Sequence, residues 1–420
     1  MSYIILLFFC LYLPFQLAVN PATGIDLASG RIIILLLALF WILEGLKNKK
    51  IIIAYKTQTL LAVSFLFLSF LSLIASQNTE WSFRKLAFLF SIFPIYFIVS
   101  GIIQNKQQVE KIIKYLVWGT GIIAIIGIIQ FLLQFILGLD KSLRLWASIT
   151  PYFLGSSFSQ AVLENSSWLV NVSGKDIFRA VSLFPDPHMF SFYLGLIVPW
   201  ALVLYFFSPQ KKRIYLFIFF AVLIVDFLTF SRGGYLGVLA GIVFAAVIFW
   251  KRIGTKHKKR LIWSLIVMVL IVSVPNPISE RFLSSFNLNE GSNKDRLETW
   301  KNSVNVIKNN ALLGVGLGNY PLEIKPSADY REPIYSHSLY LDIASETGII
   351  NAFIWIALIF ASITSYLYRS RKNAFYLGGA ISLVIFSVHS FFETPLFSAR
   401  VLPLLLIIIA LSAINNDQND

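Results

Sequence analysis

Charged residues are scarce in this chain. Only 13% of its 420 residues are Asp, Glu, Lys or Arg, whereas 57% are hydrophobic, and the mean hydropathy is +0.73. Soluble domains are about a quarter charged and about half apolar. The composition therefore excludes an ordinary soluble domain and predicts an integral membrane protein.

Cysteine and the common catalytic motifs are also nearly absent. Cys10 is the single cysteine, which excludes an intrachain disulfide and a thiolate metal site. The sequence holds no Asp-x-Asp pair, no His-Glu-x-x-His and no Gly-x-Ser-x-Gly, and the acidic residues of the long connections are scattered. We therefore expect no metal site and no cofactor.

Long apolar runs fill most of the chain. A spanning helix needs about 20 mostly apolar residues, and the runs lack the alternation of a membrane barrel. They predict an all-α, polytopic membrane protein with about twelve transmembrane helices and a large, partly helical extracytoplasmic loop. The expected spans are 3–19, 26–46, 57–75, 84–101, 112–138, 187–207, 213–229, 233–250, 261–275, 346–368, 373–391 and 398–414.

Lys and Arg gather in alternate loops between these runs. One set of loops holds nineteen cations and the intervening short loops hold five. Short loops rich in Lys and Arg stay cytoplasmic, so both termini are expected inside the cell and the connections 139–186 and 276–345 outside. No positive residue precedes Tyr3 and no small-x-small site follows, so residues 3–19 should be a span rather than a removable signal. The net charge of +14 then reflects membrane topology, not nucleic-acid binding.

Four regions follow from this topology: N-terminal spans (1–138), an interfacial segment with central spans (139–275), an outer loop (276–345) and C-terminal spans (346–420). Helix-like spacing of Leu143, Trp146, Ile149 and Phe153 predicts a helix that anchors the segment in the membrane interface. It could instead re-enter the membrane.

The outer loop should contain an amphipathic helix. Leu297, Trp300, Val304 and Ile307 recur at spacings of three and four, and Ser292 or Asn293 could cap its start. The glycines at 314, 316 and 318 could suggest a phosphate-binding loop, but no strand precedes them, so a turn that ends the helix is favoured.

Three arginines in the outer connections could carry chemistry. Arg232 stands between two spans that meet outside, before two glycines that could let a ligand approach the backbone; it could instead snorkel at a helix end. Arg179 precedes a span that starts within a Pro-Asp-Pro sequence, or is an ordinary interfacial charge. Arg296 could face the membrane, or pair with Asp295 or Glu298 in solvent.

His337 stands directly before an apolar helix in the outer loop. An unperturbed histidine has a pKa of about 6.5 and suits proton transfer near neutral pH. Of the other histidines, His257 should be solvated on the inner side, and His389 could pair with Glu393 one turn away. A titratable imidazole beside several arginines on one membrane face indicates work on an anionic, lipid-borne substrate.

Residues 175–400 contain five recognisable blocks: Arg179 with FPDPH at 184–188, SRGG at 231–234, DRLETW at 295–300, LGVGLGNY at 313–320 and HSLYLDIASETG at 337–348. Together these blocks resemble the O-antigen ligase and O-antigen polymerase superfamily of bacterial envelope glycosyltransferases. The last two, in that order and before a span, carry most of the resemblance.

The resemblance implies a ligase that moves a glycan from an undecaprenyl diphosphate carrier to an acceptor hydroxyl. The acceptor would be lipid A core or another surface carrier, at the outer face of the bacterial inner membrane. His337, Arg232 and Arg296 would be catalytic, and Arg179, Arg232 and Arg296 would hold the diphosphate. Asp186, His188 and Glu346, which stand in the matching blocks, complete the expected substrate-binding set. The transfer would be inverting and independent of metal.

Two other functions stay open. A polymerase that adds repeat units to a lipid-linked chain would use the same residues. An anion transporter is a third reading, for which Asp226 near the outer end of its span is the best candidate.

Overall fold

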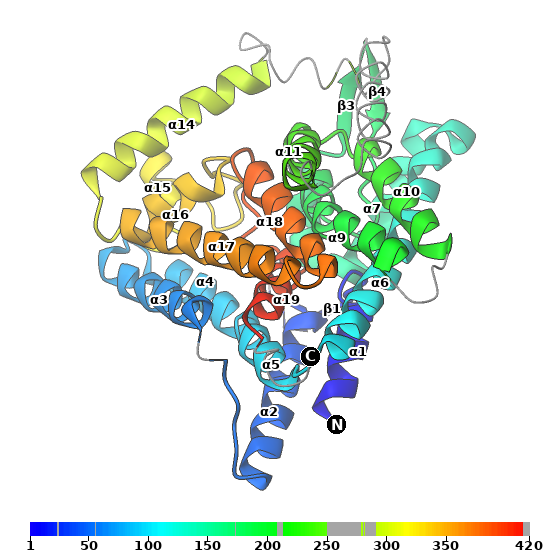
Figure 1. The fold of residues 1–420 in the computed structure, drawn as a ribbon. Helices are drawn as coiled ribbons and strands as arrows, with labels where there is room; N and C mark the ends of the chain where they lie inside the picture. Colours follow the sequence, from blue (N-terminus) through cyan, green and yellow to red (C-terminus); the bar gives the residue numbers. More distant parts are fainter. Residues whose placement is uncertain are drawn as a thin grey trace.

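The computed structural model describes residues 1–22, 25–54, 56–172, 174–207, 213–249, 279, 281 and 291–414. Within these ranges the protein is mostly helical, with two short antiparallel hairpins (Figure 1). The hairpins pair β1 (Ala18–Ala22) with β2 (Ile25–Ala28) and β3 (Leu169–Val172) with β4 (Lys175–Phe178). The all-α expectation is thus correct for the bulk of the fold and wrong for these connections.

Six helical segments in the described ranges are long and apolar enough to cross a membrane, and four further apolar helices are shorter. The count of about twelve spans is therefore not confirmed, and the span expected at 261–275 lies outside the described residues. The six segments are Ser29–Lys47, Thr57–Ala75, Thr79–Ile102, Lys106–Leu137, Pro187–Phe207 and Ile349–Ser370.

The N-terminal part holds α1 (Ser2–Tyr12), α2 (Ser29–Lys47), α3 (Thr57–Leu71) with η1 (Ser72–Ala75), α4 (Thr79–Ile92) and α5 (Pro94–Ile102). The first helix is shorter than expected because Pro14 follows its end and the chain then turns into β1. Pro94 opens α5, so the expected span 84–101 consists of two helices.

Next along the chain come α6 (Lys106–Leu137), α7 (Leu139–Leu154) and α8 (Ser156–Glu164). The predicted stripe on α7 is helical, but its residues pack inward. Trp146 is buried beside Trp168 and Phe178, with Leu143 and Ile149 packed against them. Helix α7 thus packs against the hairpin β3–β4. The role of the segment 139–170 as an interface anchor stays a prediction.

The centre of the molecule is built by α9 (Pro187–Phe207), α10 (Arg213–Leu228), α11 (Arg232–Phe249), α17 (Ile349–Ser370), η2 (Ala374–Tyr376), α18 (Leu377–His389) and α19 (Val401–Ala413). Helix α19 is buried along its whole length, and α9 over most of it. A helix that is apolar all round belongs in a core. The connections before α9 and α11 and after α18 start or end on these central helices (Figure 1).

The outer part consists of α14 (Gly291–Asn309), α15 (Tyr320–Ile324) and α16 (Leu339–Thr347). Helix α14 lies diagonally over α15 and α16 (Figure 1). The glycine run after α14 forms a turn, as expected: Gly314, Gly316 and Gly318 all have positive φ. Asn319 ties this turn to α4, because its Oδ1 accepts from the Asn78 N–H at 2.6 Å.

Candidate active site

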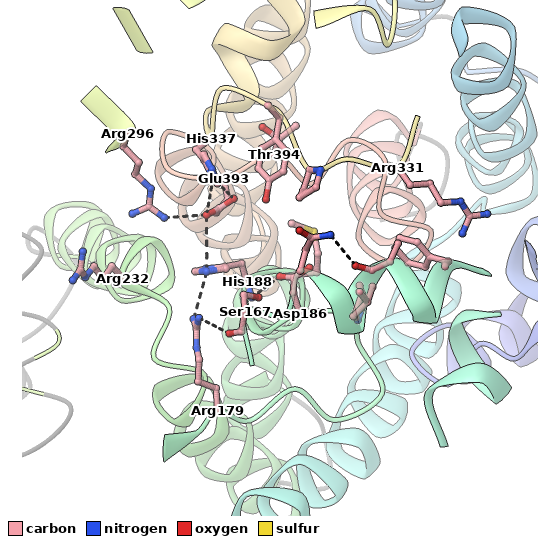
Figure 2. Close-up of a pocket in the computed structure, with 18 of the residues that line it drawn as sticks. Ser167, Arg179, Asp186, His188, Arg232, Arg296, Arg331, His337, Glu393 and Thr394 are labelled. Atoms are coloured by element: carbon pink, nitrogen blue, oxygen red, sulfur yellow. Dashed lines mark hydrogen bonds and ion pairs between the residues drawn. The ribbon is translucent and has the colours of Figure 1, made fainter. Parts of the chain in front are cut away.

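A cavity of about 560 Å³ opens between the β4–α9 connection, the starts of α11 and α14, and the connections that flank α16 and α18. Six of the seven expected site residues line it, and the seventh, Glu346, does not (Figure 2). The charged lining comprises five arginines against two carboxylates. These are Arg179, Arg232, Arg281, Arg296, Arg331, Asp186 and Glu393. The cavity is therefore strongly cationic.

Arg179 is a fixed cation in this wall. Gln130 on α6 holds the backbone there, since its amide donates to the Arg179 carbonyl at 3.1 Å and accepts from the Val181 N–H at 2.8 Å. The guanidinium donates from Nε to the Thr229 carbonyl at 2.7 Å and from Nη1 to the Ser167 carbonyl at 3.0 Å. Burial, helped by Arg281, lowers the pKa of Arg179 to about 9, so the group is charged at neutral pH.

Arg232 is the first residue of α11 and is buried in the cavity wall. Its Nη1 donates to Asn293 Oδ1 at 2.9 Å, which links α11 to α14. The same bond occupies the side chain expected to cap the outer helix, and α14 instead begins at Gly291.

The two glycines after Arg232 serve helix packing rather than ligand approach. A Cβ at Gly233 would lie 2.5 Å from His389 Cδ2, and one at Gly234 would lie 2.1 Å from Ser191 Oγ. Both positions are therefore filled by α18 and α9. The expectation that they admit a ligand is wrong, because neighbouring side chains occupy that space.

Glu393 is the hub of the site. Arg296 Nη2 donates to its Oε1 at 3.0 Å, and His337 Nδ1 lies 3.2 Å from its Oε2, while His188 Nε2 lies 3.9 Å from Oε1. Burial alone would raise the pKa of Glu393, but His188, His337 and Arg296 hold it well below its ordinary value. Glu393 is therefore ionised, and neither Asp295 nor Glu298 replaces it as the partner of Arg296.

His337 lies at the mouth of the cavity, with its side chain one-third exposed. Its backbone is left-handed, with φ 52°. Asp342 fixes this turn, because its Oδ1 accepts from both the N–H and the hydroxyl of Ser336, while its Oδ2 accepts from Thr394. With Nδ1 turned to Glu393, the tautomer that donates there leaves Nε2 as the basic nitrogen.

Asp186 and His188 join the start of α9 to this network. Asp186 Oδ1 accepts from the N–H groups of His188 and Met189 at 2.8 and 2.9 Å, which makes it the cap of α9. Burial raises the pKa of Asp186 to about 6 despite these bonds. His188 Nδ1 lies 3.0 Å from Ser231 Oγ and so reaches the residue before Arg232.

The expected pair of His389 and Glu393 is replaced by other contacts. His389 Nε2 lies 3.2 Å from Ser231 Oγ, and its ring stacks on Phe192 at 3.6 Å between centroids. The side chain of Glu393 instead faces the cavity. His389 therefore packs the helices behind the site and does not line it.

Glu346 belongs to a second polar cluster outside the cavity. Lys85 and the N–H groups of Gly318 and Tyr320 lower its pKa, but burial outweighs them and raises the pKa to about 7. Sequence reasoning missed Glu393, Arg281 and Arg331 as cavity residues. A lone acid in the short connection between two apolar runs was the one available signal for Glu393.

Residues 216–356 match the family model described as O-antigen ligase. This match, over about a third of the chain, supports the O-antigen ligase superfamily. The family suggests a membrane glycosyltransferase of the O-antigen ligase or polymerase type, and it implies a lipid-linked glycan donor and a glycan acceptor in envelope polysaccharide synthesis. No curated protein matches the chain.

The matched part of the chain contains Arg232, Arg296 and His337. Arg179, Asp186 and His188 precede the match, and Glu393 follows it. The cavity thus joins residues of the family domain to residues contributed from both sides of it.

Proposed function

We propose that the protein is an O-antigen ligase-like glycosyltransferase that moves a glycan from undecaprenyl diphosphate to an acceptor hydroxyl. The observation that carries this proposal is one cationic cavity in which a carboxylate-paired imidazole faces several arginines. Such a cavity suits a reaction in which a hydroxyl loses a proton while a diphosphate gains charge.

Arg179, Arg232 and Arg296 would hold the diphosphate. Guanidinium groups bind phosphate oxygens by charge-assisted, often bidentate hydrogen bonds. Arg179 is fixed by two backbone carbonyls and Arg296 by Glu393, so little reorganisation is needed when the ligand binds. Donors held in place in this way stabilise charge that develops in a transition state.

The transfer forms one bond and breaks one. The acceptor oxygen attacks the anomeric carbon of the donor glycan, and the bond from that carbon to the diphosphate oxygen breaks with its electron pair. The arginines receive the charge of the departing diphosphate. His337 Nε2 takes the proton of the hydroxyl, and Glu393 stabilises the resulting imidazolium through Nδ1. The anomeric carbon is inverted, and no metal is needed.

We further propose that the cavity opens to the outer side of the bacterial inner membrane, with both termini in the cytoplasm. The alternation of Lys and Arg between loops supports this orientation. The acceptor would be lipid A core or another surface glycan.

The test is a pair of substitutions, His337→Ala and Arg232→Ala, with Arg144→Ala as the control because Arg144 is an exposed cation of α7 outside the cavity. Each active-site change should lower glycan transfer by ~10²–10³-fold, and the control should leave it unchanged. Added EDTA should have no effect. Normal surface glycan in cells that make both variants at ordinary levels would refute the proposal.

Ligase and polymerase activity differ in their product. Loss of a ligase leaves long lipid-linked glycan in the membrane, whereas loss of a polymerase leaves single repeat units. Gel analysis of the lipid-linked fraction from the His337→Ala strain separates the two, and we expect the long form.

A further inference from the structure

A second hollow lies beside the arginine cavity and has a different chemistry. It has a volume of about 310 Å³ and runs between α14 and the successive helices α16 and α17. We call it the apolar groove. Nine of its ten lining residues are Val304, Ile307, Tyr340, Leu341, Ala344, Ile349, Ala352, Phe353 and Ile356, and Lys308 at the rim is the tenth.

The groove lies on a different face of α14 from the face that packs on the protein. The inner face of that helix is closed by Val306, which packs with Tyr320, and by the 2.7 Å hydrogen bond between the hydroxyls of Ser303 and Tyr320. Val304 lies on the neighbouring face and remains 39% exposed. Val304 and Ile307 of the predicted apolar stripe therefore line the groove.

Aromatic contacts join the groove to the arginine cavity. Val304 lies eight residues after Arg296 on α14, about 12 Å along the helix. Between them Trp300 packs on Phe392 with 6.4 Å between ring centroids, and Tyr340 of the groove packs on Phe391 at 4.7 Å. The two phenylalanines directly precede Glu393. One short segment, residues 391–393, therefore contacts both the apolar groove and the arginine cavity.

The opposite end of the groove continues along a membrane helix. Phe353 and Ile356 stand in the first two turns of α17, which is long and apolar enough to cross a bilayer. Phe360, one turn further, is also exposed. Apolar side chains thus link the cavity, through two aromatic pairs, to the groove and to the exposed side of a helix long enough to span a membrane.

We propose that the apolar groove binds the single polyisoprenoid chain of the donor while its diphosphate occupies the arginine cavity. The inference rests on the proposed function, which supplies that donor. An apolar groove linked by aromatic contacts to a cationic cavity fits a lipid with an apolar chain and a multiply charged head. A membrane phospholipid such as phosphatidate could place one chain in the groove, but it carries a single phosphate rather than a diphosphate for the arginine cavity.

The experiment measures protection of an introduced thiol in the full-length protein. Val304→Cys and Phe353→Cys place thiols in the groove, and Leu312→Cys places one at a highly exposed apolar position outside it. The native Cys10 is fully buried and should stay unlabelled. Maleimide labelling rates are compared with no addition and with undecaprenyl diphosphate, inorganic pyrophosphate or dioleoyl phosphatidate.

Undecaprenyl diphosphate should slow labelling at both groove positions by at least about fivefold and leave Leu312→Cys unchanged. Pyrophosphate, which lacks a chain, and phosphatidate, which has a single phosphate in place of the diphosphate, should not protect. Adding Arg296→Ala to Val304→Cys should remove most of the protection, because head and chain belong to one molecule.

Equal protection by phosphatidate would assign the groove to ordinary membrane lipid and overturn the inference, as would no protection at either groove position. Failure of the two proposals can be told apart. Wild-type transfer without groove protection refutes only the groove, whereas protection together with normal transfer by His337→Ala refutes only the catalytic proposal.

Discussion

Glu393 and Glu346 are two carboxylates withdrawn from water in different surroundings. Glu393 has Arg296, His188 and His337 around it, and they lower its pKa although it is buried. Glu346 has backbone N–H donors and Lys85, and burial raises its pKa to about 7. The positive groups beside each acid therefore decide its state. Glu393 is charged and lines the cavity, whereas Glu346 secures the glycine turn.

The largest expected difference is in the rate of transfer when each of the two carboxylates is neutralised separately. Glu393→Gln should lower transfer by roughly 10²-fold or more, because His337 loses the anion that orients it and stabilises its charged form. Glu346→Gln should change transfer less than about threefold. Initial rates of the purified variants measure both, and equal losses would erase the distinction between the two acids.

The glycine turn beside Glu346 can be broken without touching the cavity. Gly314 has φ 67°, and an added Cβ would lie 2.4 Å from the backbone carbon of Glu346. Gly314→Ala should lower the free energy of unfolding by ~2–4 kcal/mol through strain and overlap. Gly138→Ala is the matched control, since φ is 84° there but nothing lies within 4 Å.

Thermal unfolding in detergent compares the two glycine variants. The control should lose only the part due to backbone strain, ~1 kcal/mol. If both variants lose the same amount, the close contact with Glu346 contributes nothing.

A smaller loss is expected where Asn319 ties the same turn to α4. Its Oδ1 accepts from the Asn78 N–H at 2.6 Å, and its Nδ2 donates to Ser82 Oγ at 2.8 Å. Asn319→Ala leaves these buried groups unpaired and should cost ~1–3 kcal/mol. The exposed Asn302→Ala on α14 is the control for the unfolding midpoint, and it should not shift.

A further difference between the two acids is expected in the pH dependence of stability. The folded pKa of Glu346, about 7, exceeds its ordinary value of 4.5, so its contribution to stability is full below pH 4.5 and is lost as pH rises to about 7. The pKa of Glu393 is lowered, so its contribution is present above pH 4.5 and is lost as pH falls below that value.

Unfolding midpoints between pH 4 and 8 test these opposite signs. Relative to the wild type, Glu346→Gln should flatten the decline between pH 4.5 and 7, and Glu393→Gln should not. A steeper decline in Glu346→Gln would contradict the assignment.

Part of this site could be predicted from the local sequence, and the rest could not, for a physical reason. Arg232, Arg296 and His337 stand beside span ends or in short recognisable blocks, so topology alone placed them on one face. Glu393 was missed as their partner because its bonds to Arg296 and His337 cross 97 and 56 residues. Only the packing of α18 against α11 and α9 brings it to the cavity.

The fold shows the same limit. Within the described ranges the apolar runs coincide with helices, but the run of residues 84–101 does not reveal that Pro94 starts a second helix. The glycines after Arg232 were interpreted as space for a ligand, whereas neighbouring helices fill that space. Composition predicts that a segment is a membrane helix; contacts with other segments decide what its small residues are for.

The left-handed backbone at His337 has a practical consequence. Glycine adopts φ near 52° without cost, whereas alanine resists it. His337→Gly would therefore keep the turn and leave a hole the shape of the missing ring beside Glu393. Imidazole supplied in solution could occupy that hole and restore turnover, and chemical rescue of this kind would separate the chemistry of the ring from its part in folding.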